Sequence, residues 1–199
     1  MLNEPFKDLE AFDQHYQKVV NNKENPGIFY TVLTKPALKP DGLIALMEIN
    51  TQHRSLEIGH VIFSPTLQHT TSATEAVYLA LHYSFLLGFT RVVWKCNNLN
   101  EASKKAARRL GFEFEGVHKR HMVVKGRVRD TAWFALTLDT WPMVKDAFEA
   151  WLRPENFDGN GMQRLSLQVG GHYTFRQVLS RDRSPGAESV GGEGNILFD

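Results

Sequence analysis

The sequence predicts an α+β fold, and three observations lead to that class. Residues 28–34 are rich in β-branched and aromatic side chains, and further apolar runs follow at 43–50 and 55–63, so the three indicate an antiparallel meander. Helical and strand patterns then alternate from residue 73 onward. A last pair of strands completes the pattern. Strands in series followed by helices that cover them are typical of the α+β class.

Each element of the first half has a local reason. Residues 7–22 place apolar side chains at three- and four-residue intervals, which predicts an amphipathic helix. Two prolines and an Asp-Gly pair indicate a turn at 35–42. The polar loop 64–72 ends in three hydroxyl residues that can cap the helix predicted at 73–87. That helix is apolar on nearly all sides, so we expect it to be buried, and Gly88 ends it.

The second half continues the alternation. Residues 90–96 contain few polar side chains, as a central strand would. An Asn-rich turn leads into a helix at 101–110, which Gly111 ends. The remaining predicted elements are a strand at 112–120, a hairpin turn at 124–130, a strand at 131–138 and a helix at 141–152. From about residue 168 the chain is rich in Gly, Ser and Arg without periodicity, so we predict a domain at 1–167 and a mostly disordered tail at 168–199.

Composition excludes several classes of protein. The 199 residues include 23 Lys+Arg and 22 Asp+Glu, and the formal net charge of +1 gives no overall field to attract nucleic acid or an anionic membrane. A single cysteine, Cys96, cannot form an internal disulfide or a cysteine-rich zinc site. No apolar run approaches the ~18–20 residues of a membrane span. We therefore expect a cytoplasmic protein without metal, membrane or nucleic-acid partner.

The order of motifs in the middle of the chain resembles that of the GNAT acyl-CoA N-acyltransferases, in particular their RimJ/RimL-like branch. The segments that carry the resemblance are LEIGHVIFSP (56–65), LQHTTSATEA (67–76), LGFTRVVWKCNNLNEAS (87–103) and RRLGFEFEG (108–116), and it continues through VVKGRVRDTAWFAL (123–136) and WLRPENFDGNGMQRLSL (151–167).

This resemblance implies a three-layer α/β/α fold with a mixed, mostly antiparallel sheet. In such proteins the sheet is splayed between two strands, which here would be 55–63 and 90–96, and the acyl-CoA arm lies in the splay. The implied activity is transfer of an acetyl group from acetyl-CoA to a primary amine by direct attack. Family members begin with an extra strand and helix, and we expect this sequence to lack them, which would leave an edge strand open to pairing and suggests a homodimer. The alternative is a catalytically impaired CoA-binding or structural protein.

The resemblance also implies a binding site for acetyl-CoA as co-substrate. A helix N-terminus preceded by a loop is by itself suited to phosphate, although an ordinary capped helix has the same pattern. Thr71 stands where the family's loop usually has its central glycine, and His69 replaces another small residue, so we expect CoA binding to be reshaped. The implied contacts are the backbone of Val61, Ile62 and Phe63, the loop residues Gln68, His69, Thr70, Thr71, Ser72, Ala73 and Thr74, and Asn100 and Ser103 beside the arm.

Two residues are candidates for the proton transfers that acyl transfer to an amine requires. Glu57 lies on the strand that leads to the splay, where the resemblance implies a base, and an apolar cleft raises the pKa of a carboxyl group. Glu48 is a second candidate. The family's usual tyrosine acid is replaced by Ala107, so Ser103 is the substitute. The alternatives are a surface glutamate and a serine that only starts a helix.

Strand alternation predicts which neighbours share the face of Glu57. It places Gly59, Val61 and Phe63 on that face and His60 on the opposite one. The same rule separates His118 from His121, which argues against a metal site there. A basic stripe at Lys104, Lys105, Arg108 and Arg109 fits a solvated helix face or a contact with the CoA 3′-phosphate, and Trp94, Trp133 and Phe134 are assigned to the core.

Overall fold

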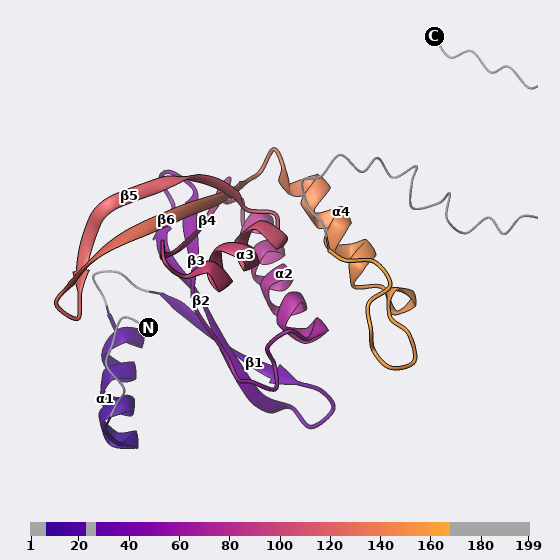
Figure 1. Cartoon of the computed structure of the whole chain (residues 1–199), viewed down its shortest axis with the longest axis horizontal. Helices are drawn as coiled ribbons and strands as arrows, with labels where there is room; N and C mark the ends of the chain where they lie inside the picture. The colour runs from indigo at the N-terminus through magenta and orange to yellow at the C-terminus, as the bar shows by residue number, and fades with distance from the viewer. Residues whose placement is uncertain (1–6, 23–26, 168–199) are drawn as a thin grey trace, which may run out of the picture. The chain divides into compact units, whose positions relative to one another are not determined.

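The computed structural model describes residues 7–22 and 27–167, and the predicted α+β class is confirmed (Figure 1). The elements are α1 (Leu9–Val20), β1 (Ile28–Thr34), β2 (Lys39–Asn50), β3 (Ser55–Phe63), α2 (Thr71–Leu86), β4 (Arg91–Asn97), α3 (Glu101–Arg109), β5 (Glu113–Val124), β6 (Arg127–Thr137), α4 (Trp141–Trp151) and a 3-10 turn at Pro154–Asn156. The predicted tail at 168–199 lies outside the described residues.

The six strands form one sheet in the order β1-β2-β3-β4-β6-β5. Every neighbouring pair is antiparallel except β3 and β4, which run parallel. The sheet is therefore mixed and mostly antiparallel, as predicted.

Two predicted turns are longer than the observed ones. β2 already begins at Lys39, although Pro40 and Gly42 suggested a turn there. Proline is tolerated because β3 ends opposite Gly42, so the start of β2 has a strand partner on one side only. The β5–β6 hairpin likewise turns at 125–126, where Gly126 has a φ of 68°.

The core lies between one face of the sheet and helices α2, α3 and α4. Val77, Leu81 and Phe85 of α2 are buried in it, which explains why that helix is apolar on most sides. Phe148 of α4 and Phe134 of β6 are fully buried there. The α2 and α4 helices therefore cover the same face (Figure 1).

Helix α1 contacts the opposite face. Phe29 of β1 pairs with Ala45 of β2, which alternates with the core residues Ile44 and Leu46, so Phe29 faces away from the core. The ring of Tyr16 in α1 lies 6.2 Å from that of Phe29. No helix in the described ranges is both long and apolar enough to cross a bilayer.

Candidate functional site

The parallel strands β3 and β4 pair over three residues only and then separate. The last of the three pairs joins Glu57 to Val93. Beyond these residues the facing edges of β3 and β4 no longer pair with each other. β3 leads to the N-terminus of α2, and β4 leads to that of α3. The gap between the strands therefore begins at Glu57 and opens toward two helix N-termini, which agrees with the predicted splay.

A β-bulge in β3 reverses the predicted side-chain alternation. Ala45 and Leu43 of β2 pair with Gly59 and Ile62, so β3 holds one residue more than β2 between these pairs. The extra residue is accommodated at His60, whose φ is 45°. As a result, the prediction that placed Val61 and Phe63 on the face of Glu57 is wrong, because both pack against the core. His60 was predicted to face away from Glu57, yet its ring lies 5.5 Å from that of the outward-facing Phe29.

Glu57 forms a largely buried ion pair at the point where the strands separate. Its Oε2 lies 2.6 Å from Nζ of Lys95, and the side chains of Glu57 and Lys95 are 12% and 21% exposed. Burial raises the pKa of the Glu57 carboxyl, the nearby Glu48 adds to the rise, and the charges of Lys95 and Arg129 oppose it. The predicted elevated pKa of Glu57 therefore agrees with the structure, but the ion pair with Lys95 was not predicted.

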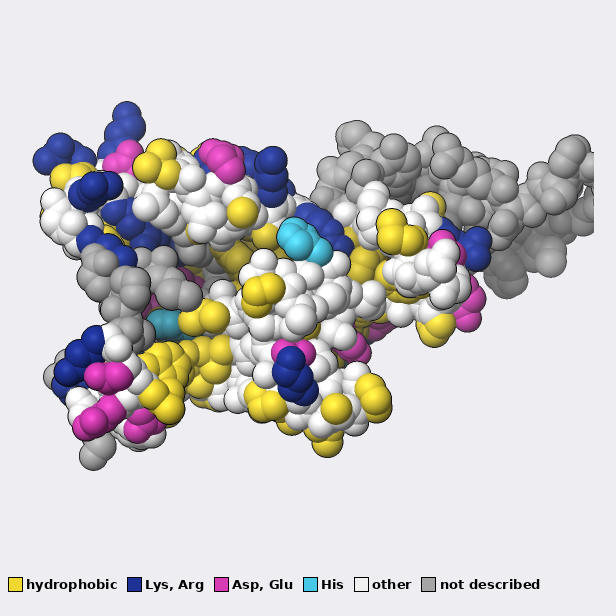
Figure 2. All heavy atoms as spheres, turned by 60° about the horizontal axis from the view of Figure 1, so that its bottom comes forward, with side chains coloured by type: hydrophobic (Ala, Val, Ile, Leu, Met, Phe, Trp, Pro, Cys, Tyr) yellow, Lys and Arg dark blue, Asp and Glu magenta, His cyan; other side chains and the backbone are white. Residues whose placement is uncertain are grey.

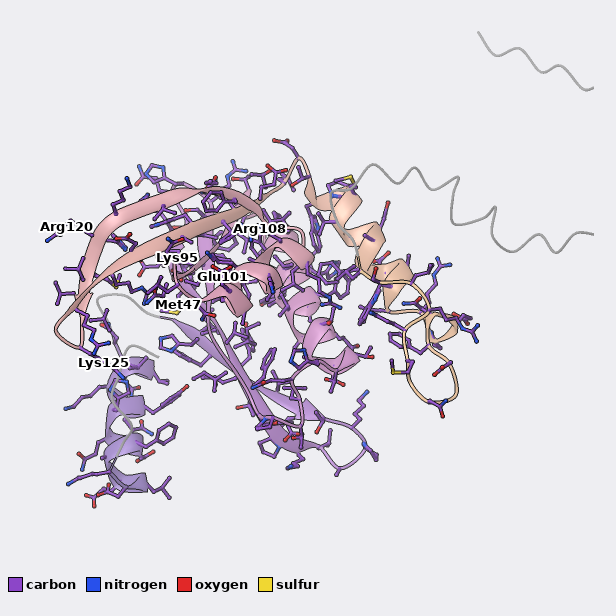
Figure 3. The ribbon with its side chains drawn as sticks, viewed as in Figure 1. Met47, Lys95, Glu101, Arg108, Arg120 and Lys125 are labelled. Atoms are coloured by element: carbon purple, nitrogen blue, oxygen red, sulfur yellow. The ribbon has the colours of Figure 1, made fainter. Side chains whose placement is uncertain are left out.

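Lys95 also connects Glu57 to an aromatic pair. Its ammonium lies 4.8 Å from the centre of the Trp133 ring, and Trp133 stacks on His118 at 4.5 Å (Lys95 is labelled in Figure 3). The assignment of Trp133 to the core is wrong, because this residue pairs with Lys95 across the strands and shares its face, whereas Trp94 and Phe134 are core residues.

The two histidines of β5 approach each other, although alternation was expected to separate them. The register of β5 shifts between His118 and Met122, and Arg120 within the shift has a φ of 51°. The rings of His118 and His121 consequently lie 5.5 Å apart, and Nδ1 of His121 is 3.0 Å from Oγ1 of Thr131. Among the described residues no third His, Cys, Asp or Glu joins them to form a metal-binding group.

The loop before α2 presents part of the predicted anion site. Thr70 caps the helix, with its hydroxyl accepting from the amide of Ala73. The amides of Thr71 and Ser72 lie in the first turn of the helix and donate to no atom of the described chain. Thr71 has helical geometry, and His69 has the positive φ of 61°, so the residue in a conformation that favours glycine is His69 rather than Thr71.

Other predicted loop contacts are already occupied within the chain. The side-chain amide of Gln68 donates to the carbonyl of Phe63 at 2.9 Å, and the amide of Thr74 donates to the carbonyl of Thr70 at 3.4 Å. The buried Thr74 hydroxyl accepts from Arg109 at 3.1 Å. The guanidinium of Arg109 also lies over the ring of Trp151. Arg109 of the predicted basic stripe is thus exposed, as on a solvated helix face, while its guanidinium also contacts residues of α2 and α4.

On the β4 side of the gap, the predicted pair Asn100 and Ser103 forms the start of α3. The side chain of Asn100 caps the helix by accepting from the amide of Ser103 at 3.0 Å. The hydroxyl of Ser103 accepts from the indole Nε1 of Trp94 at 2.9 Å. Since Ser103 is the acceptor in this bond, it can still donate its own proton. One acceptor for that proton is the sulfur of Cys96: burial raises the pKa of this thiol, and the hydrogen bond from Ser103 lowers it.

Sequence reasoning missed three residues on the face of Glu57: Lys95, Arg129 and Trp133. Lys95 is the single charged residue in the otherwise apolar run Val92–Cys96, and a lone lysine in a central strand is a signal that could have been used. Arg129 and Trp133 alternate with core residues on β6, so register with β4 was needed to place them.

With this geometry described, comparison with known proteins identifies the family. Residues 3–113 match the model of the acetyltransferase (GNAT) domain. The chain belongs to the GNAT acetyltransferase family. A solved structure of a GCN5-related N-acetyltransferase from Brucella melitensis is 40% identical, with a TM-score of 0.79 over 84% of this chain and 75% of that one.

Two curated relatives are more distant. The spermidine N(1)-acetyltransferase of Escherichia coli K12 is 34% identical over 90 residues, which are 45% of this chain and 48% of that protein. The uncharacterized N-acetyltransferase YoaA of Bacillus subtilis is 28% identical over 129 residues, or 64% of this chain and 69% of YoaA. The match therefore spans about half the length of the E. coli relative, and the substrate in its name describes that protein alone.

Proposed function

We propose that this GNAT domain transfers an acetyl group from acetyl-CoA to a primary amine by direct attack, with Glu57 as the base. The observation that carries the proposal is the separation of β3 and β4 directly beyond Glu57. It leaves a gap lined by unpaired strand edges, with a carboxyl group of raised pKa at its narrow end. The free amides of Thr71 and Ser72 stand at its open end and can bind a phosphate group.

In the proposed reaction the residues of the gap move two protons. Glu57 takes a proton from the acceptor ammonium, so that the amine can attack the thioester carbon. A C–N bond forms and the C–S bond breaks, and the thiolate leaves. The second proton, which the attacking nitrogen loses as the amide forms, passes to the sulfur through the hydroxyl of Ser103, which takes up one proton as it gives another and is held at the start of α3. The edge of β3 at Val61–Phe63 would bind the amide groups of the arm.

Glu57→Gln tests this assignment directly. Gln keeps the shape of the side chain but cannot take a proton, so we expect turnover with an accepted amine to fall by about 10²-fold or more. Affinity for acetyl-CoA, measured by calorimetry, should change little. Glu149→Gln is the matched control, since Glu149 lies on α4 and bonds Tyr78. Turnover that is unaffected by Glu57→Gln removes this residue from the role.

One alternative has a specific observation in its favour. Lys95 already occupies Oε2 of Glu57, as it would in a protein that had lost the acceptor site. Binding of acetyl-CoA without release of thiol across a broad panel of amines would support a CoA-binding protein without turnover. The RimJ/RimL-like branch, a homodimer and a cytoplasmic location stay predictions from the sequence.

A further inference from the structure

The sheet face that carries Glu57 contains two buried N–H donors without an acceptor. They are Nε of Arg129 and Nε1 of Trp133, and neither has a hydrogen-bond partner within the described part of the chain. Both lie on β6, where they alternate with the core residues Ala132 and Phe134 and so share the face of Lys95. Because native proteins satisfy nearly all buried donors, two on one face point to a ligand with acceptor oxygens.

The two donors belong to the surroundings of Glu57. Trp133 lies under the ammonium of Lys95, which in turn is paired with Glu57. The charge of Arg129 acts on the same carboxylate. A ligand whose amine approaches Glu57 would therefore bring its neighbouring atoms to Arg129 and Trp133.

The wider electrostatics of this face disfavour a polycation. From Glu115 to Asp130 the β5–β6 hairpin contains five Lys and Arg residues against these two acids. Glu115 is already paired with Arg91, and Asp130 accepts from the backbone amide of Arg120. Figure 2 shows the resulting group of dark-blue side chains at the upper left, over the hairpin whose Arg120 and Lys125 are labelled in Figure 3. Such a field repels polyamines and attracts anionic groups.

The face also offers a recess for the body of a ligand. A depression next to Lys95 is lined by Arg91, Glu115, Gly116, Val117, His118 and Trp133. The stacked rings of Trp133 and His118 form an aromatic surface in it. Within this recess Arg91 is paired with Glu115, so the pair is neutral as a unit, and Arg129 lies outside the recess, four residues before Trp133 on β6.

We propose that this face binds the acceptor and selects an amine that itself carries an anionic oxygen group, a carboxylate or a phosphate. The proposal rests on the proposed acetyl transfer. Arg129 binds the anionic oxygens, Trp133 donates a second hydrogen bond, and Glu57 receives the proton of the amine. The acceptor class thus differs from the spermidine named for the E. coli relative in carrying an anionic group.

The test compares matched amines in a thiol-release assay with acetyl-CoA. The panel contains the free amino acids and O-phosphoethanolamine, called anionic amines here because they carry an anionic group beside the amine, the amino-acid amides and ethanolamine as counterparts that lack this group, and spermidine. We expect kcat/KM for the best anionic amine to exceed that for its counterpart and for spermidine by about ten-fold or more, the change expected from one charge-assisted hydrogen bond. Comparing the amino acids with O-phosphoethanolamine distinguishes a carboxylate from a phosphate as the selected group.

Arg129→Met also removes a charge that acts on Glu57, so the diagnostic quantity is the ratio of kcat/KM for the anionic amine to that for its counterpart, which should fall about ten-fold. Arg127→Met, an exposed arginine on the same strand, is the control and should keep the preference. Equal use of anionic and neutral amines, faster use of spermidine, or a preference that survives Arg129→Met overturns the proposal. Failure of acetyl-CoA to bind, or a lack of thiol release with every amine of the panel, counts instead against the proposed function.

Discussion

Replacing Lys95 with methionine tests how the pKa of Glu57 is set. Methionine keeps an apolar stem over Trp133 but removes the charge 2.6 Å from Oε2. Two unit charges whose centres are about 4 Å apart attract by about 4 kcal/mol at an effective dielectric constant of 20, which corresponds to about 3 pKa units. The Glu57 side chain is 12% exposed, and the solvent that reaches it screens part of this attraction. We therefore expect the pKa of Glu57 to rise by about 1 to 3 units.

The assay is the pH dependence of kcat/KM for the variant and the parent protein. A base must be ionised to act, so the acidic limb of the Lys95→Met profile should move to higher pH, with activity recovered at alkaline pH. Lys145→Met is the control, because its partner Glu149 is exposed at a distance of 3.6 Å. An acidic limb that does not move would refute the conclusion that Lys95 lowers the pKa of Glu57.

The same substitution has a consequence for stability. Because burial raises the folded-state pKa of Glu57, protonation of this group favours folding below its unfolded pKa, and that contribution is lost as pH rises through the folded value. In Lys95→Met the folded pKa is higher still, and the ionised carboxylate lacks its partner. The loss of unfolding free energy should therefore reach about 3 to 5 kcal/mol at alkaline pH and be smaller near pH 4. Urea unfolding at both pH values measures the difference.

Three further substitutions test the scaffold of the site. Ser103→Ala leaves the indole N–H of Trp94, a residue 7% exposed, without its acceptor, and should lower the free energy of unfolding by about 1–3 kcal/mol in urea. Gly42→Ala would place a Cβ 2.7 Å from a methyl of Leu67, and we expect the free energy of unfolding to fall by about 1–3 kcal/mol. Acetyl-CoA binding should also weaken, because Leu67 anchors the loop before α2. An unchanged affinity would contradict that link. Gly59→Ala would place a Cβ 2.8 Å from Sδ of Met47 and 3.4 Å from Oε1 of the proposed base, so Met47 must shift beside Glu57, and kcat should fall while calorimetry shows an unchanged affinity for acetyl-CoA.

The architecture could be predicted from the sequence because the patterns that specify it are local and regular. β1 and β3 have the predicted bounds, and α2 and β4 differ from them by one or two residues. The capping residues of both helices beside the gap were also visible, since Thr70 and Asn100 are common N-cap types. The splay itself came from a family resemblance, because no local pattern shows where two parallel strands separate.

The errors in the side-chain facing of β3 and β5 have one physical origin, which is the β-bulge. Bulges in β2, β3 and β5 occur near Glu48, His60 and Arg120, each with a positive φ. None of the three is glycine, so the sequence contains no signal for the conformation. One extra residue exchanges the two faces of the rest of a strand. Rules based on alternation therefore assigned Val61 to the wrong face, although they placed Glu57, which precedes the bulge, correctly.

The bulge and the ion pair together decide which oxygen of Glu57 can act as the base. Lys95 holds Oε2, so the other oxygen, Oε1, is the one available to an acceptor. Oε1 lies beside Gly59, where a Cβ would contact it at 3.4 Å. Gly59 is the last residue of β3 before the bulge at His60. The acceptor must then approach along the outward face of β3 and not from the core. That approach passes over Lys95 and Trp133 on β4 and β6, so under the proposed function the chemistry of these neighbours, and not of the base alone, should decide which amine is accepted.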